Sequence, residues 1–298
     1  MYDAKVTSAE PALLVILLDQ SSSMDVTLIG AEDGERFSIA RMAKYVVDEF
    51  LYEAFNKCIR EDELKPYLDI AVIGYALGLR SALPKIPLEQ FPFSVTKLAD
   101  THIAENPRNP DVNPVVRPPR YEWLTERAHG DTPMLAAFTK AREIIEKWLP
   151  DHQTSLPPVV INISDGMPSD DSDIREMIEH DGYFGDLSQT SLLAEADKIR
   201  AIGTENGKCL ICNCHVSVAG VKQIHYPLSS DEAEQIDGTS KLMFEMSSII
   251  PAPFLGGYNN LQAEPGARFY TLNADICSSR FFFGNHDPDM ADFRPDPK

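Results

Sequence analysis

Positive charge is scarce in this sequence for its size. The 298 residues include 27 lysines and arginines against 46 aspartates and glutamates, so the net charge is −19. Proteins that bind nucleic acid or anionic lipid need a basic surface to meet the phosphates. We therefore expect no nucleic-acid partner and no membrane partner, and a surface that attracts cations or basic proteins.

Apolar segments long enough for a signal peptide or a membrane span are not evident in the sequence either. The apolar stretch at residues 12–18 is too short for a signal-peptide core and far too short to span a bilayer. Cysteine is scarce and odd in number, with five residues of which three fall within residues 209–214. This is not the pattern of a disulfide framework, so we expect reduced thiols and a cytoplasmic protein.

Three common catalytic motifs are absent. Asp19 is followed by Gln20 and Ser21, which excludes the D-x-D of haloacid-dehalogenase-like phosphotransferases. There is no Walker-type phosphate-binding loop and no G-x-S-x-G nucleophile elbow. We therefore assign no catalytic residue.

What the sequence does contain is an alternation of short apolar runs and amphipathic segments. We expect strands at residues 12–18, 68–76, 158–164, 208–220 and 267–273, and helices at 39–59, 132–149, 187–202 and 240–250. A short edge strand within 81–99 is also expected. This order predicts an α/β fold with a Rossmann-like, doubly wound, mostly parallel central sheet flanked by helices.

The predicted domain organisation is simple. We expect a single domain over residues 10–275 and a C-terminal tail over 276–298. Residues 106–120 contain five prolines in 15 residues, which excludes a helix or a central strand and predicts an exposed insertion loop.

Polar side chains follow two of the predicted strands and begin one of the predicted helices. Asp19, Ser21 and Ser23 follow the first strand, Asp165 follows the strand at 158–164, and Thr132 begins a helix. In open α/β sheets, ligands bind beyond the carboxyl ends of the strands. Carboxylates and hydroxyls are hard oxygen donors, which suit Mg²⁺ better than they suit zinc.

In this order, "DQSSS", "GDTP" and "SDG" resemble the metal-ion-dependent adhesion site (MIDAS) of von Willebrand factor A (vWA) domains. The family motif is D-x-S-x-S, a later Thr and a later Asp, and every position is filled here. The resemblance covers roughly residues 10–275 and, more loosely at its C-terminal end, is similar to bacterial intracellular members. The loop at residues 24–37 is longer than in the shortest family members. Together with the loop at 106–120, it is expected to border the metal-binding face and to influence partner choice.

The resemblance implies a non-enzymatic interaction module that binds Mg²⁺ or Mn²⁺ through the following residues: Asp19, Ser21, Ser23, Thr132 and Asp165. An Asp or Glu of a partner protein often completes the metal coordination. Bacterial intracellular members work as adaptors beside AAA+ ATPases, kinases or phosphatases in stress-response or defence systems. The competing hypotheses are a Mg²⁺-dependent hydrolase or phosphotransfer enzyme, and a scaffold that no longer binds metal. The sequence leaves the oligomeric state open.

Each candidate ligand also has a purely structural interpretation. Ser21 and Ser23 could cap a helix, Thr132 could be the N-cap before Pro133, and Asp165 could belong to a simple turn. We prefer the metal interpretation because the three segments occur together.

Other polar groups are given the structural interpretation. An acidic cluster could form a second cation site, but a solvated helix start is preferred: Asp170, Asp171 and Asp173. A group of thiols and an imidazole could bind zinc, but buried strand residues are preferred because strand alternation separates Cys209 from the next two: Cys209, Cys212, Cys214 and His215. His129 is taken as a surface residue rather than a base, and Arg117 and Arg120 as solvated rather than partner-binding.

Overall fold

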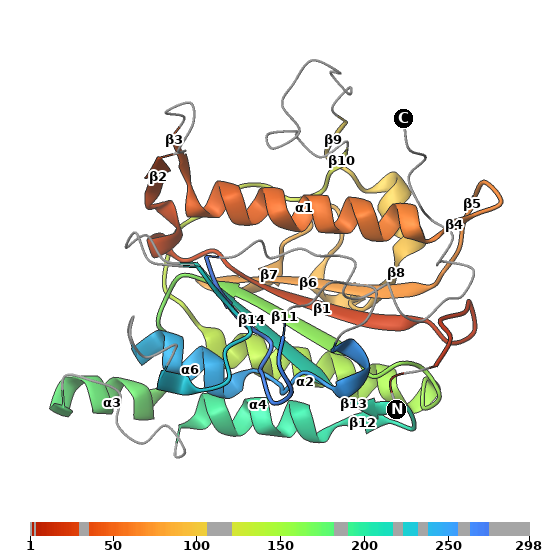
Figure 1. The fold of residues 1–298 in the computed structure, drawn as a ribbon. Coiled ribbons are helices and arrows are strands. Elements are labelled where there is room, and N and C mark those ends of the chain that lie inside the picture. The colour runs from red at the N-terminus through yellow and green to blue at the C-terminus, as the bar shows by residue number, and fades with distance from the viewer. Residues whose placement is uncertain are drawn as a thin grey trace.

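The molecule is built around one twisted sheet with helices on both sides (Figure 1). The computed structural model describes residues 2, 4–29, 36–105, 121–181, 190–216, 223–231, 238–255 and 263–273. The predicted insertion loop at 106–120 and the tail at 276–298 lie outside the described residues. The single domain over 10–275 therefore stays a prediction.

Eight strands form the central sheet, seven of them in the order β15-β16-β14-β11-β1-β6-β7, while β8 also pairs with β6. The inner strands are parallel, and the antiparallel pairs are at the edges of the sheet. The bounds are β1 Ala12–Asp19, β6 Leu68–Ala76, β7 Gly78–Ser81, β8 Phe93–Ser94, β11 Val159–Ser164, β14 Leu210–His215, β15 Ile224–His225 and β16 Tyr270–Leu272.

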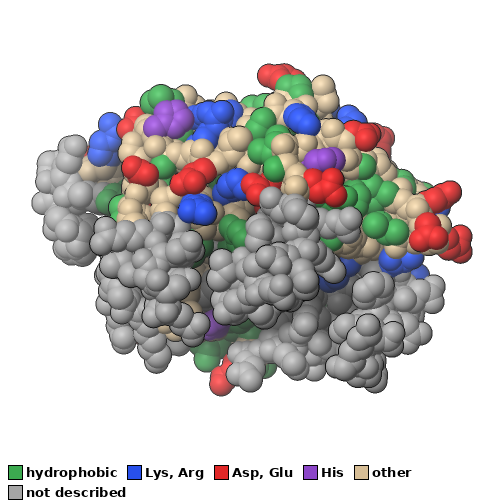
Figure 2. Space-filling model, turned by 90° about the horizontal axis from the view of Figure 1, so that it is seen from above, with side chains coloured by type: hydrophobic (Ala, Val, Ile, Leu, Met, Phe, Trp, Pro, Cys, Tyr) green, Lys and Arg blue, Asp and Glu red, His purple; other side chains and the backbone are tan. Residues whose placement is uncertain are grey.

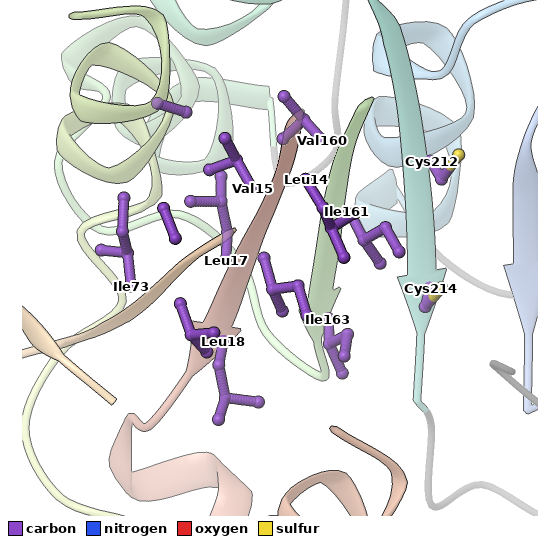
Figure 3. Packing of buried hydrophobic residues seen from close by; sticks show 14 of the residues in the cluster. Leu14, Val15, Leu17, Leu18, Ile73, Val160, Ile161, Ile163, Cys212 and Cys214 are labelled. Atoms are coloured by element: carbon purple, nitrogen blue, oxygen red, sulfur yellow. The ribbon is translucent and has the colours of Figure 1, made fainter. Parts of the chain in front are cut away.

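Strand β1 lies in the middle of this sheet because its side chains are apolar on both faces. It pairs in parallel with β11 on one side and β6 on the other, and residues 13–18 are all buried. Figure 3 shows Val15 and Leu17 on one side of β1, and Leu14 with Ile161 of β11 on the other. Burying each such side chain contributes about 1.5–3 kcal/mol, so this strand is a rigid base for whatever follows its carboxyl end.

The helices divide between the two faces. Helix α1 (Ile39–Lys57) lies on one side of the sheet, and α2 (Met134–Trp148), α4 (Ser191–Ala201) and α6 (Gly238–Met246) lie on the other (Figure 1). Helices α2, α4 and α6 contact the central strands directly. Helix α3 (Ser172–Asp181) follows β11 and extends beyond the sheet.

Short elements connect these layers. The β2–β3 hairpin stands beside η1 at one end of the molecule (Figure 1), and the remaining pairs are small antiparallel ladders. Their bounds are η1 Ser22–Asp25, β2 Thr27–Ile29, β3 Arg36–Ser38, β4 Ile59–Arg60, β5 Glu63–Leu64, η2 Leu88–Gln90, η3 Val95–Asp100, β9 Ala104–Glu105, β10 Tyr121–Glu122, η5 Leu149–Asp151, β12 Gly203–Thr204, β13 Gly207–Lys208 and η7 Ala252–Phe254.

The predicted fold class is confirmed, and the predicted elements differ from the observed ones mainly at their ends. The strand predicted at 68–76 is β6 without change, whereas the helix predicted at 39–59 ends at Lys57 because β4 begins at Ile59. The short edge strand predicted within 81–99 is β8, which pairs with β6 and is followed by η3. The strand predicted at 208–220 is β14 from Leu210 to His215, and residues 217–222 lie outside the described part.

A chain of buried polar side chains crosses the sheet beneath the helices. The Tyr75 hydroxyl donates to Asn162 Oδ1 at 2.9 Å, and Asn162 Nδ2 donates to Asn213 Oδ1 at 3.0 Å. Asn213 in turn donates to Ser247 Oγ and to the Met243 carbonyl of α6. Because unpaired polar groups are costly in a core, these bonds fix the register of β6, β11 and β14 against α6.

Candidate metal site at the carboxyl edge of the sheet

The first segment of the candidate site is the turn that follows β1. Asp19 is 1% exposed, and its Oδ1 accepts a hydrogen bond from the Ser21 backbone N–H at 2.9 Å. The hydroxyl oxygens of Ser21 and Ser23 are 2.9 Å apart. The alternation D-x-S-x-S thus brings three oxygen-bearing side chains to one side of the chain as it leaves the strand.

The second and third segments reach the same place from distant parts of the sequence. Asp165 directly follows β11, and its Oδ1 accepts a hydrogen bond from Ser23 Oγ at 2.9 Å. Strands β1 and β11 are parallel neighbours, so their carboxyl ends lie at the same edge of the sheet. Asp19 at the end of β1 and Asp165 after β11 therefore lie at that edge. Thr132, just before α2, is also buried at this edge.

Gly166 defines the point on which these oxygens converge. A Cβ built on this glycine would lie 3.2 Å from Ser23 Oγ, 3.5 Å from Thr132 Oγ1 and 3.7 Å from Asp19 Oδ2. Side chains from two segments that are more than a hundred positions apart thus surround a space that a single methyl group would enter. The donor set, two carboxylates and three hydroxyls, is the kind that Mg²⁺ and Mn²⁺ prefer. The residues present therefore fit a small divalent cation.

The electrostatics of the site also favour a cation. Burial raises the pKa of Asp19 to about 6, against hydrogen bonds from Ser164 and Ser21 that lower it, and the charge of Asp165 adds to the rise. Burial likewise raises the pKa of Asp165. Among the described residues, neither carboxylate has a lysine, arginine or histidine as an ion-pair partner. Two partly desolvated carboxylates that face each other without a basic side chain are best stabilised by a bound cation.

Sequence reasoning missed one residue of this arrangement, Ser164. It is the last residue of β11, it is buried, and its Oγ donates to Asp19 Oδ2 at 2.5 Å. The Gly166 backbone N–H donates to Ser164 Oγ at 3.1 Å. Ser164 therefore orients one carboxylate oxygen while the Ser21 backbone orients the other. The available signal was a hydroxyl at the end of the apolar run "VVINIS".

Among the residues that the structure describes, no side-chain hydrogen bond supports the capping interpretations of the candidate ligands. Ser21 is the residue before η1 but makes no side-chain capping bond, and Pro133 rather than Thr132 occupies the N-cap of α2. The first turn of α2 is capped from another segment, because the Asp170 carboxylate accepts from the N–H groups of Leu135 and Ala136.

The acidic cluster after Asp165 serves the helices, although not as a solvated start. Asp171 is fully buried and accepts from the N–H groups of Asp173 and Ile174 in α3 and of Leu192 in α4. Asp171 thus connects the starts of α3 and α4, and the neighbouring Asp170 bonds the start of α2. The expectation that these acids are merely solvated is therefore wrong for Asp171.

Ser22 lies between two candidate ligands but has a different role. Its Oγ donates to the Gly130 carbonyl at 3.0 Å and accepts from the Gly130 N–H at 2.8 Å. These two bonds hold the loop before Thr132 against the turn after β1. Ser22 thus positions a segment of the site rather than adding an oxygen to it.

The thiols and histidines behave as predicted from strand alternation and exposure. Four cysteines are free and buried, and Cys212 and Cys214 line β14 beside the core (Figure 3). Within the described part of the chain, no three side chains of His, Cys, Asp or Glu gather as a metal cluster. His129 is exposed, while Cys277, Arg117 and Arg120 lie outside the described residues.

Comparison with known proteins gives similarity at the level of structure. No protein-family model matches the chain, and no curated protein matches it. Similar solved structures include a von Willebrand factor domain. That structure is the vWF domain of the type V pili tip protein Mfa5 from Porphyromonas gingivalis, with a TM-score of 0.43, 12% identity, and coverage of 97% of this chain and 99% of that one.

Two other similar structures are longer than this chain. The PilB minor pilin of Streptococcus sanguinis has a TM-score of 0.39 and 10% identity, with 95% of this chain and 60% of that one covered. Proximal thread matrix protein 1 from the mussel byssus, described in one crystal with zinc in its MIDAS motif, has a TM-score of 0.34 and 15% identity; 79% of this chain and 42% of that one are covered. The chain thus spans less than half the length of the mussel protein.

Among the described helices, none combines the length and the apolar character needed to cross a bilayer.

Proposed function

We propose that this chain is a non-enzymatic, divalent-metal-dependent protein-interaction module of the vWA type. The observation that carries the proposal is the convergence of oxygen donors from three separate segments around the space next to Gly166. A fold that needed only turns and caps at this edge would not bring two carboxylates together without a basic partner.

The metal ligands in this proposal are Asp19, Ser21, Ser23, Thr132 and Asp165. When bound, Mg²⁺ or Mn²⁺ supplies a positive charge with a coordination position open to a carboxylate. Asp19, Ser21 and Thr132 are buried, while Ser23 is exposed and Asp165 half-buried. A partner's Asp or Glu therefore approaches from the side of Ser23 and Asp165, and the surrounding loops determine which partner fits.

The setting proposed for this module follows from its resemblance to bacterial intracellular vWA proteins. In that setting the chain is a cytoplasmic adaptor for an AAA+ ATPase, a kinase or a phosphatase in a stress or defence system. The cheapest support would be such a gene beside this one.

The competing proposal is a Mg²⁺-dependent hydrolase or phosphotransfer enzyme on the same sheet. Such chemistry needs an exposed Asp nucleophile and usually a nearby lysine. Asp19 is instead 1% exposed and held by two hydrogen bonds. These features favour a binding role for the carboxylate over a nucleophilic one.

An EDTA-reversible capture experiment separates the two proposals. The immobilised chain should retain a protein partner in Mg²⁺ and release it in EDTA, and an Asp19→Ala variant should retain none. In parallel, hydrolysis of p-nitrophenyl phosphate is measured with Mg²⁺ and with Mn²⁺. Turnover that is lost in Asp19→Ala would replace the interaction module by the enzyme.

A further inference from the structure

The edge of the sheet that carries the candidate metal site also carries unusual apolar exposure. Six large hydrophobic side chains are exposed among the described residues, and three of them are at this edge. Leu77 is 70% exposed, Val26 is 43% exposed and Met167 is 41% exposed. Singly exposed hydrophobic residues are common, but a group of them around one site marks a contact surface.

Each of these three exposed side chains lies on a segment that contains, bonds or packs against a segment of the candidate site. Met167 directly follows Gly166, whose backbone faces the hydroxyl of Ser23. The Val26 N–H donates to the Ser23 carbonyl at 3.2 Å. These two side chains therefore lie on the loops that supply Asp165 and the serines.

Leu77 borders the site from the side of the third segment. It lies in the turn between β6 and β7, and a Cβ built on Gly130 would lie 2.7 Å from its Cγ. Gly130 is in turn held by two hydrogen bonds with Ser22. Leu77 thus packs on the loop that leads to Thr132 and still leaves most of its surface in solvent.

Positive charge accompanies Leu77, in a chain whose net charge is −19. Arg80 is three residues further along, on β7, and Arg127 precedes the loop of Gly130. Burial and then the nearby charge of Arg127 lower the pKa of Arg80. Within the described part of the chain, neither guanidinium pairs with a carboxylate. Two arginines close together without an acid complement an acidic partner.

We propose that the metal face docks an acidic peptide segment of a partner protein in which bulky apolar residues flank the metal-binding Asp or Glu. The carboxylate meets the cation next to Gly166, and the flanking apolar side chains pack on Leu77, Met167 and Val26. Further acidic residues of the segment lie toward Arg80 and Arg127. This inference rests on the proposed function and adds the chemistry of the partner to it.

The test uses a random dodecapeptide display library on the immobilised full chain. Peptides are bound in Mg²⁺ and eluted with EDTA, and the recovered sequences are determined. We expect an Asp or Glu with a Leu, Ile, Phe, Tyr or Trp within two positions. The double variant Leu77→Ser and Met167→Ser should weaken binding of a recovered peptide at least about tenfold, because both side chains lose the apolar surface that the peptide would bury. Its Mg²⁺ affinity should be unchanged.

Ile249→Ser provides the matched control. Ile249 is 56% exposed, but it pairs with Arg268 before the start of β16, away from the carboxyl ends of the strands. This variant should bind the recovered peptide as the wild type does. Equal weakening by Ile249→Ser would show a general loss of apolar surface and would overturn the proposed contact.

The other outcomes separate this inference from the function on which it rests. Peptides that elute with EDTA but have only polar neighbours around the acid would overturn the apolar contact and leave the metal-dependent module intact. No EDTA-eluted peptide would overturn both. Mg²⁺-dependent self-association that Leu77→Ser abolishes, measured by sedimentation velocity, would make a second copy of this chain the occupant instead of a partner.

Discussion

At the scale of single residues, the candidate site depends on the absence of a side chain at Gly166. A Cβ there would enter the space between Ser23 Oγ, Thr132 Oγ1 and Asp19 Oδ2. We predict that Gly166→Ala lowers Mg²⁺ affinity at least about tenfold while the free energy of unfolding of the metal-free protein changes by about 1 kcal/mol or less. Isothermal titration and urea unfolding measure the two quantities.

Met167→Ala is the control for this substitution, because it changes the adjacent residue without adding an atom near the donors. It should leave Mg²⁺ affinity within about twofold of the wild type. If Gly166→Ala bound Mg²⁺ as tightly as Met167→Ala does, the space next to Gly166 would not be the cation site.

Substitution of two serines near the site should lower Mg²⁺ affinity to different extents. Ser164 orients Asp19 by donating to its Oδ2, so Ser164→Ala should lower Mg²⁺ affinity about 10-fold or more, as other partners of metal ligands do. Among the described residues, the Ser22 hydroxyl bonds the Gly130 backbone and no candidate ligand, so Ser22→Ala should lower Mg²⁺ affinity less than about threefold. Titration of Mn²⁺ followed by electron paramagnetic resonance measures both, and equal effects would refute the assigned roles.

The sequence was sufficient to find the candidate ligands but not the residues that hold them. Asp19, Ser21 and Ser23 follow a motif with fixed spacing after an apolar strand, and Asp165 follows a second strand that pairs with the first. Ser164 carries no such spacing, because its partner Asp19 is 145 positions away. Contacts of that kind depend on which strands become neighbours, and this is decided by the whole sheet.

At the scale of elements, the bounds of buried strands could be predicted from apolar runs more accurately than the ends of helices could be predicted from their sequences. Strand β6 matches its predicted bounds because burial on both faces makes the run continuous. The start of α2 was predicted less well, because its capping carboxylate belongs to Asp170, 34 to 35 positions later in the sequence. A cap supplied from another loop leaves no local signal in front of the helix.

A buried carboxylate on helix α1 leads to a prediction about how stability depends on pH. Asp48 accepts from the N–H groups of Trp123 and Leu124 and from Lys44 Nζ, and burial raises its pKa to about 6. A raised pKa in the folded state means that the folded form holds the proton more tightly than the unfolded form. The contribution of Asp48 to stability is therefore present below about pH 4 and is lost as the pH rises through about 6.

Asp48→Asn isolates this contribution, because an amide can still accept from both backbone N–H groups and Lys44 keeps Glu122 as a partner. Relative to this variant, the wild type should lose on the order of 3 kcal/mol of unfolding free energy between pH 4 and pH 7. Urea unfolding of the metal-free proteins at several pH values measures the difference. Parallel curves for the two proteins would contradict a raised pKa at Asp48.

At the scale of the whole molecule, cation binding at the candidate site must be distinguished from the general attraction of cations by the net negative charge. On the side where α1 lies, acidic and basic side chains are interspersed among the coloured residues of Figure 2. A chain of charge −19 nevertheless attracts cations generally. Binding at one site must therefore be measured in about 0.15 M salt, where exposed charges more than about 8 Å apart are largely screened.

The most direct test of the account is the titration of Mg²⁺ and Mn²⁺ into the wild type and an Asp19→Asn variant in that salt at pH 7.5. The amide can keep the contacts of Asp19 with the Ser21 backbone and Ser164, so the variant removes the charge and little else. The account predicts one saturable site in the wild type and at least a hundredfold weaker binding in the variant. Absence of a saturable site in the wild type, or equal affinity in the two proteins, would contradict it.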